Sequence, residues 1–182
     1  MFYDLKECRK GGYAYYDSKV EVTDKDGIIT FTFIAEHSDY FSPRKGYNQH
    51  HCVGDACEIL IGSDPERRFY YEIEISPRND LMIALSENRG IREDGKLDLV
   101  TNHWENCFVK SEVTLRNGGY VAKVWFDKKD IMSGDGEIYF NAYRLETDGG
   151  YMEKHLFALN PTLQGRFHVP EKFVYLKDYA NK

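Results

Sequence analysis

Alternation of apolar and polar residues, interrupted at short intervals by Gly, Asp and Asn, is the feature that most constrains this chain. In the segment 69–76, for example, Tyr71, Ile73 and Ile75 alternate with Tyr70, Glu72, Glu74 and Ser76. Successive side chains of a strand point to opposite faces, so a period of two predicts strands rather than amphipathic helices. Many short strands at this spacing predict an all-β fold, a single antiparallel β-sandwich.

Residues that favour tight turns lie between the predicted strands. Segments 20–23 and 28–35 flank Asp-Lys-Asp-Gly, and segments 108–115 and 120–126 flank Asn-Gly-Gly. Gly and Asp tolerate the positive φ that tight turns require, so both pairs are predicted to form hairpins. One or two short helical turns are the most that the sequence predicts, with Lys128 to Met132 as the candidate. Further strands are predicted at 56–61, 69–76, 81–85, 138–145, 154–159 and 173–176.

The chain shows no internal boundary. No repeat, low-complexity tract or Pro/Ser-rich linker divides it, so residues 1–182 are predicted to form one domain. The stretch 37–54 is the longest irregular piece, and it is polar and aromatic. Long loops in compact domains often carry function, which makes this stretch a candidate part of a site.

Composition excludes several classes of protein. The net charge of -6 argues against nucleic-acid binding, whose affinity comes largely from Lys and Arg at phosphates. No apolar run is long enough to cross a membrane as a helix. The first residues lack a basic region followed by an apolar run, so no signal peptide is predicted. The sequence as given therefore predicts a cytoplasmic protein, or an extracellular one from which a leader has been removed.

Metal ligands of the right types occur without a convincing pattern. His50, His51, Cys52 and Cys57 are close in sequence, but a zinc site needs four converging ligands at recognisable spacings. We therefore expect no metal and no cofactor. Calcium stays open, because acidic residues that could bind it also occur in plain turns; they are Asp24, Asp26, Asp64 and Glu66. The four cysteines are interpreted as free buried thiols, with paired disulfides as the alternative.

Five collinear segments, between about residues 13 and 177, resemble the motifs of family 9 carbohydrate-binding modules. The first two are DACEILI (55–61) and YYEIEISP (70–77), which are similar to the family's "DxVEIF…YYEFEVNP". The other three are GYVAKVWF (119–126), FNAYR (140–144), and ALNPT with FHVPEKF (158–162 and 167–173). The resemblance implies a sandwich that binds a sugar end or a short oligosaccharide without cleaving it, as an accessory domain of exported polysaccharide-degrading enzymes.

The same resemblance implies a set of ligand-binding residues. Glu58 and Asn141 match a sugar-binding acid and amide of the family, and Glu74 matches a position that is arginine in some members. Cys52 and Arg144 stand where the family carries its two clamping tryptophans. An arginine in place of a ring favours an acidic or strongly hydrogen-bonding ligand. Tyr47, Tyr143 and Trp104 are candidate replacements for the rings, and the full predicted set is Glu58, Glu74, Asn141, Arg144, Tyr70, Tyr143, Trp104 and His168.

Two properties of the residues themselves bear on this set. Carboxylates and amides hydrogen-bond sugar hydroxyls, and aromatic rings cover the apolar face of a pyranose. Asn141 and Arg144, however, are three apart, so a regular strand points them to opposite faces. Both His168 and Arg144 also have a structural interpretation. His168 is interpreted alternatively as a residue that fixes its loop, and Arg144 as an ion-pair partner of Glu58.

Three alternatives to sugar binding stay open at this stage. One is a small hydrolase or isomerase with His168 and Glu58 as acid and base. Another is a structural or protein-interaction domain whose aromatic surface packs on a partner. The third is a haem-binding relative of the sandwich, with Met and His as axial ligands. The sequence does not indicate an oligomeric state.

Overall fold

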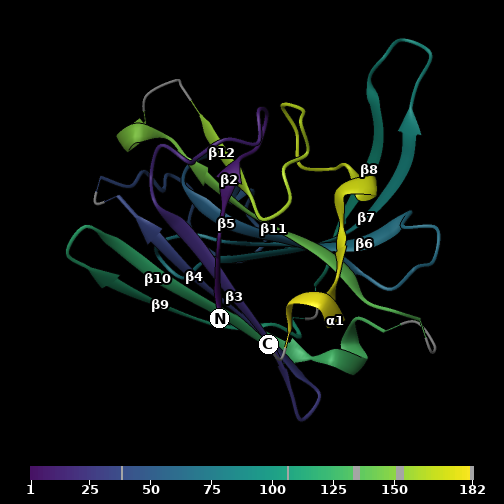
Figure 1. Cartoon of the computed structure of the whole chain (residues 1–182), viewed down its shortest axis with the longest axis horizontal. Coiled ribbons are helices and arrows are strands. Elements are labelled where there is room, and N and C mark those ends of the chain that lie inside the picture. Colours follow the sequence, from purple (N-terminus) through teal and green to yellow (C-terminus); the bar gives the residue numbers. More distant parts are fainter. Residues whose placement is uncertain (38, 106, 133–135, 151–153, 181–182) are drawn as a thin grey trace.

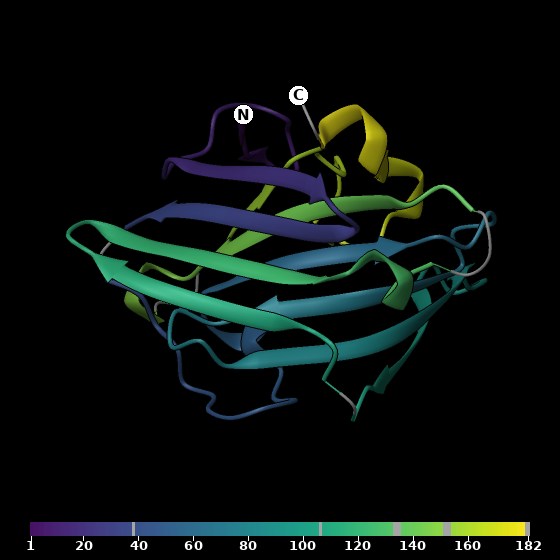
Figure 2. The same cartoon turned by 90° about the horizontal axis from the view of Figure 1, so that it is seen from below.

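The computed structural model describes residues 1–37, 39–105, 107–132, 136–150 and 154–180, and it consists of two antiparallel sheets packed face to face. Figure 1 shows the strands of both layers, and Figure 2 shows β3, β4, β10 and β9 running side by side in one of them. The predicted all-β sandwich is confirmed. No helix in the described part of the chain is long and apolar enough to span a membrane.

The smaller sheet has five strands in the order β1-β3-β4-β10-β9. Both predicted hairpins lie in it, and the turn between β3 and β4 uses positive φ at Asp26 and Gly27, as the sequence indicated. Its strands are β1 (Phe2–Asp4), β3 (Ser18–Lys25), β4 (Ile28–Glu36), β9 (Lys110–Arg116) and β10 (Gly119–Asp127).

The larger sheet has eight strands in the order β2-β12-β11-β5-β6-β7-β8, and β13 also pairs with β11. The hairpin of β7 and β8 projects beyond the body of the sandwich (Figure 1). Its strands are β2 (Lys6–Glu7), β5 (Ala56–Gly62), β6 (Phe69–Ile75), β7 (Leu81–Ile91), β8 (Leu97–His103), β11 (Tyr139–Glu146), β12 (His155–Ala158) and β13 (Val174–Tyr175).

Helical structure in the described residues is limited to single turns. The 3-10 turns are η1 (His51–Val53), η2 (Lys128–Asp130), η3 (Asp148–Gly150) and η4 (Pro170–Lys172), and the α-helical turn is α1 (Leu176–Tyr179). The predicted turn at 128–132 is thus present as η2. The rings of Tyr3 and Tyr179 lie 4.9 Å apart, so the two ends of the chain meet.

The main core lies between the two sheets. Every second residue of β4 is buried, and its Phe31 ring meets Phe140 of β11 edge to face at 5.2 Å. The alternation that predicted the strands therefore fills one interface. Burial of such aromatic side chains contributes the largest share of the driving force for folding.

A second, smaller apolar layer covers the opposite face of the larger sheet, which we call the outer face. It combines Leu60, Tyr70 and Tyr143 of the sheet with Phe167 and Phe173 of the segment 159–173. This second layer was not predicted from the sequence. It matters for function because it places a covering segment over polar residues of β5 and β6.

The cysteines are all free thiols. Cys8 and Cys57 are buried, as interpreted from the sequence, whereas Cys52 is half-buried and Cys107 is exposed. The Cys57 side chain lies in the core between the sheets, on the opposite face from the outer layer. It therefore does not converge with His50 or Cys52.

Candidate binding site

Three glutamates meet on the outer face of the larger sheet. Glu58 of β5 lies directly opposite Glu74 of β6, and Glu72 precedes Glu74 by two residues on the same face. Because the side chains of a strand alternate, the apolar residues between them enter the core while the carboxyl groups share the outer face. The sequence pattern YYEIEI thus builds a carboxylate cluster as a direct consequence of strand geometry.

This acid cluster is buried rather than solvated. Glu58 is 2% exposed, Glu74 0% and Glu72 7%. Burial, and then the neighbouring carboxylates Glu72 and Glu74, raise the pKa of Glu58 well above its ordinary value. Burial and Glu74 raise the pKa of Glu72 to about 7. The cluster therefore retains protons at a pH where exposed glutamates have lost them.

Glu74 is held by the loop before β5. Its Oε2 accepts hydrogen bonds from the backbone N–H groups of His51, at 2.5 Å, and Cys52, at 3.0 Å. These bonds favour the charged form, although burial raises the pKa of Glu74 overall. The long irregular stretch 37–54 is thus tied to the acid cluster by hydrogen bonds.

A hydrogen-bonded chain leads from the sheet to His168. Asn88 donates to the Tyr70 hydroxyl at 3.2 Å, and that hydroxyl lies 3.0 Å from His168 Nδ1. His168 Nε2 faces Glu72 Oε2 at 3.7 Å. Burial, with Arg166 nearby, lowers the pKa of His168 to about 4, so the ring is neutral at pH 7. His168 therefore both fixes its loop and contributes to the cluster.

The segment 159–173 closes much of the outer face. Phe167 stacks on Tyr143 at 4.1 Å, and the Tyr143 hydroxyl donates to the Phe167 carbonyl. Asn141 donates to the carbonyl of Asn160 at 2.8 Å and accepts from the Asn160 N–H at 3.1 Å. Asn141 shares the face of Glu58, but its amide holds the covering segment in place.

Arg144 does not join the cluster. It points into the interface between the sheets, where its guanidinium donates to Ser18 Oγ at 2.6 Å, to the Glu36 carbonyl at 3.0 Å and to Glu146 Oε2 at 2.5 Å. The expectation that Arg144 and Glu58 share one site is therefore wrong, for the reason given by strand alternation. Arg144 forms its ion pair with Glu146 and not with Glu58.

Trp104 also lies away from the cluster. It follows β8 and packs edge to face against Tyr71, at 5.6 Å, on the side of the core. Its backbone carbonyl accepts hydrogen bonds from Tyr47 and Asn48. Of the predicted site residues, the structure thus brings together Glu58, Glu74, Tyr70, Tyr143 and His168, with Asn141 beside them.

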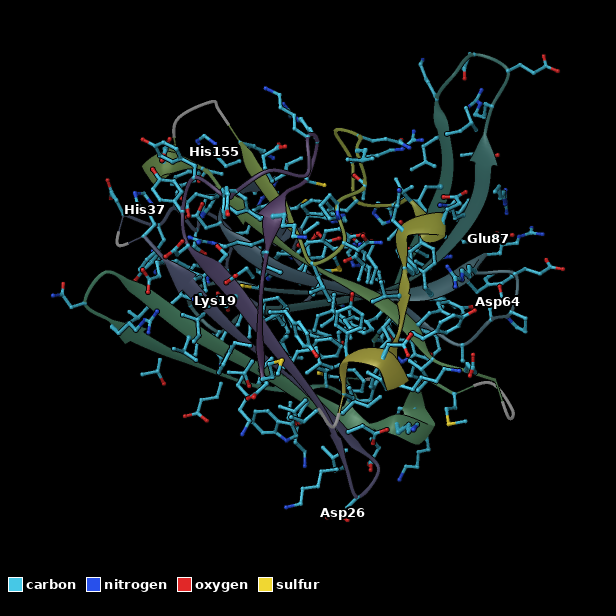
Figure 3. All side chains as sticks on the ribbon, viewed as in Figure 1. Lys19, Asp26, His37, Asp64, Glu87 and His155 are labelled. Carbon is cyan, nitrogen blue, oxygen red and sulfur yellow. The ribbon has the colours of Figure 1, made fainter. Side chains whose placement is uncertain are left out.

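A second polar cluster lies at one end of the sandwich. Figure 3 shows His37 and His155 near each other there, and the ring of Tyr16 is 4.2 Å from His37 and 5.9 Å from His155. His37 Nδ1 lies 2.9 Å from Glu146, and His155 Nε2 lies 3.1 Å from Asp148. Because its imidazoles and carboxylates hydrogen-bond to one another, this cluster is built as a structural network.

Comparison with solved structures decides what kind of sandwich this is. No model of a known protein family matches the sequence, and no curated protein is similar to it in sequence. The fold is similar to that of a "putative carbohydrate-binding protein" from Bacteroides uniformis ATCC 8492, with a TM-score of 0.74 and 14% identity over 96% of this chain and 84% of that one. The chain has a CBM9-like fold.

Two family 9 carbohydrate-binding modules (CBM9) of Caldicellulosiruptor kristjanssonii support this assignment. The structure in complex with glucose has a TM-score of 0.59 and 11% identity, over 95% of this chain and 82% of that one. The structure in complex with cellotriose has a TM-score of 0.54 and 11% identity, over 86% and 71%. The resemblance inferred from five short motifs is thereby confirmed at the level of the fold.

The sequence-based prediction left out one residue of the acid cluster and did not include a second surface. Glu72 was seen on the face of Glu74 but was not included in the predicted site, although the same alternation placed it there. Tyr13 and Tyr15 are exposed beside a surface hollow of about 540 Å³ next to β12, and Tyr15 stacks on His155 at 5.7 Å. Exposed rings beside polar residues are a second arrangement that suits sugars.

Proposed function

We propose that this chain binds carbohydrate reversibly, without cleaving it, on the outer face of the larger sheet. The observation that carries the proposal is the gathering of Glu58, Glu72 and Glu74 with His168 on one face. Carboxylates accept hydrogen bonds from sugar hydroxyls, and a neutral imidazole can donate or accept. The CBM9-like fold supports the proposal, since two of its structural neighbours were solved with glucose and cellotriose.

Access to the acid cluster is the main constraint on the ligand. Glu58 and Glu74 are almost completely buried, whereas Glu72 is 7% exposed and the His168 side chain is 16% exposed. A sugar therefore meets Glu72 and His168 first. The site suits a chain end or a single ring better than the middle of a long polymer.

Charge selects the class of sugar. The cluster consists of acidic groups, and the arginine that favoured an acidic ligand lies on the other side of the sheet, paired with Glu146. A carboxylate on the ligand would add another acidic group to a buried site that has no basic partner for it, which is unfavourable. We therefore expect neutral sugars to bind better than uronic acids, the reverse of the expectation from sequence.

A glycan array followed by titration calorimetry tests the proposal. Glucose, cello-oligosaccharides and uronic acids are titrated into the protein and into three variants. Glu72→Gln is expected to weaken binding about tenfold or more, through loss of a charged hydrogen bond, whereas Glu112→Gln, an exposed carboxylate on β9, is expected to leave it unchanged. Binding that is lost in Tyr15→Ala and kept in Glu72→Gln would move the site to the tyrosine hollow and refute the proposal.

One observation favours hydrolysis as a second candidate. A carboxylate oxygen of Glu58 and one of Glu72 lie within 4.8 Å of each other, and burial raises the pKa of both groups. Glycosidases also use two neighbouring carboxyl groups, one of which is a general acid with a raised pKa. Turnover of an aryl glycoside that is abolished by Glu58→Gln would establish this activity. Absence of turnover, with sugar binding intact, is the outcome that the binding proposal expects.

A further inference from the structure

We infer that Glu58, Glu72 and His168 form a binding site for a divalent transition-metal ion such as Zn²⁺. One ligand atom from each of the three residues lies within 4.8 Å of the others. Two carboxylates and an imidazole are a donor set that Zn²⁺ binds, with an open position for water or another oxygen. This inference goes beyond sugar binding and does not depend on it.

An unpartnered oxygen aims into this site. Glu58 Oε1 is fully buried and has no hydrogen-bond partner among the described residues, although a buried polar atom without a partner is costly. Glu74 Oε1, from the facing position on β6, is in the same condition. A cation at the centre of the site would satisfy an oxygen that the protein itself leaves without a donor.

No basic side chain of the described residues neutralises these carboxylates. Lys154 acts on Glu74 without forming an ion pair with it, and no lysine or arginine within the described ranges forms an ion pair with Glu58, Glu72 or Glu74. Buried carboxylates need either protons or a cation. A metal ion meets this need and is small enough to enter a site that the segment 159–173 largely covers.

His168 is oriented as metal-binding histidines are. One ring nitrogen, Nδ1, is engaged by the Tyr70 hydroxyl, and the other, Nε2, faces Glu72 at 3.7 Å. Such a partner on the far nitrogen fixes the ring, and Tyr70 can accept from both Nδ1–H and Asn88, which leaves Nε2 free to bind. Ligands of one Zn²⁺ stand about 3 to 3.5 Å apart, so a shift of about 1 Å closes the site.

The neighbouring group of His50, Cys52 and Glu74 is a weaker competitor. Its ligand atoms are equally close, but Glu74 Oε2 already accepts two backbone N–H groups. His50 is exposed, whereas Glu58 and Glu72 are buried. We therefore assign the ion to Glu58, Glu72 and His168.

Calorimetric titration of Zn²⁺ into the full chain, stripped with EDTA and free of sugar, tests the inference. One ion per chain is expected, with affinity lowered about 100-fold or more in Glu58→Gln and His168→Gln. The imidazole rings of His50 and His103 lie 4.9 Å apart and are a pair of neighbouring histidines near the cluster. Glu112→Gln and the double variant His50→Ala/His103→Ala are expected to bind as the wild type does. No binding, or loss of binding only in the His50/His103 variant, would overturn the assignment. Sugar titration of the EDTA-treated protein tests the proposed function separately.

A measurement on the wild-type chain tests the metal site without any variant, and so does not depend on whether a variant folds. Co²⁺ replaces Zn²⁺, and the paramagnetic ion broadens NMR signals of nearby nuclei. We expect the amide signals of residues 58, 72 and 168 to broaden most. Broadening centred instead on residues 50 and 103 would contradict the inference.

Discussion

At the scale of single residues, the structure separates side chains that gather on the outer face from side chains that hold the sandwich together. Arg144 is 1% exposed and connects β11 to β3 and β4 across the core, with Glu146 as its charged partner. Strand alternation made this orientation predictable. The motif position alone predicted that Arg144 lies in the ligand site. That prediction was wrong because a match to a family position does not determine which face of the sheet the side chain occupies.

Arg144→Met is expected to lower the free energy of unfolding by about 3–5 kcal/mol, because it leaves Glu146 buried without its main cation. Arg144→Met/Glu146→Gln should recover part of this loss. Urea denaturation measures both variants. Sugar affinity of the folded fraction should equal that of the wild type, and a selective loss of affinity at unchanged stability would place Arg144 in the binding site after all.

Asn141 is expected to act through the covering segment. Asn141→Ala removes its hydrogen bonds with Asn160 and should cost about 1–3 kcal/mol, since the partly buried backbone groups of Asn160 lose their partner. Hydrogen exchange should accelerate at the Asn160 amide more than at amides of β4. The matched control is Asn102→Ala on the exposed part of β8, which should change neither quantity. Slow exchange at Asn160 in the variant would contradict this role.

At the scale of elements, most strands were predicted from the sequence, and β1, β2 and β8 were not. β4, β5, β6, β10 and β11 were found within a residue or two of their ends. β1 and β2 are very short, and Leu97–His103 of β8 has no fully buried residue, so these strands carry no periodic signal. The burial of Glu72 and Glu74 could not be predicted either, because segments distant in the sequence cover them.

The loop that holds Glu74 depends on a close approach at Gly54. A Cβ there would lie 2.3 Å from the Phe41 carbonyl oxygen, a backbone atom that cannot easily move. Gly54→Ala should therefore shift η1 and cost about 1–3 kcal/mol. Gly12→Ala, where nothing lies within 4 Å, should change stability by about 0.5 kcal/mol or less. Equal melting temperatures for the two variants would refute this explanation.

At the scale of the whole molecule, one core joins both sheets, and no described segment has a separate core of comparable size. The sandwich and its CBM9-like character could be predicted because pattern, turns and motif order agree. The ligand preference could not, because it depends on which face each polar residue reaches and on what covers that face.

A single domain is expected to unfold in one cooperative transition. Scanning calorimetry should give equal calorimetric and van't Hoff enthalpies, because the inner faces of both sheets contribute to one cluster. Two resolved transitions would show that residues 1–182 contain more than one folding unit.

The central claim is that the outer face of the larger sheet is the binding face. The most direct test is an NMR titration in which a glycan that binds is added to ¹⁵N-labelled protein. We predict the largest shifts at the amides of Cys52, Glu72 and His168, and at that of Ser86, whose hydroxyl donates to Glu72 at 3.2 Å. Shifts confined to residues 13–15 and 154–157, or no shift with any glycan, would contradict the claim.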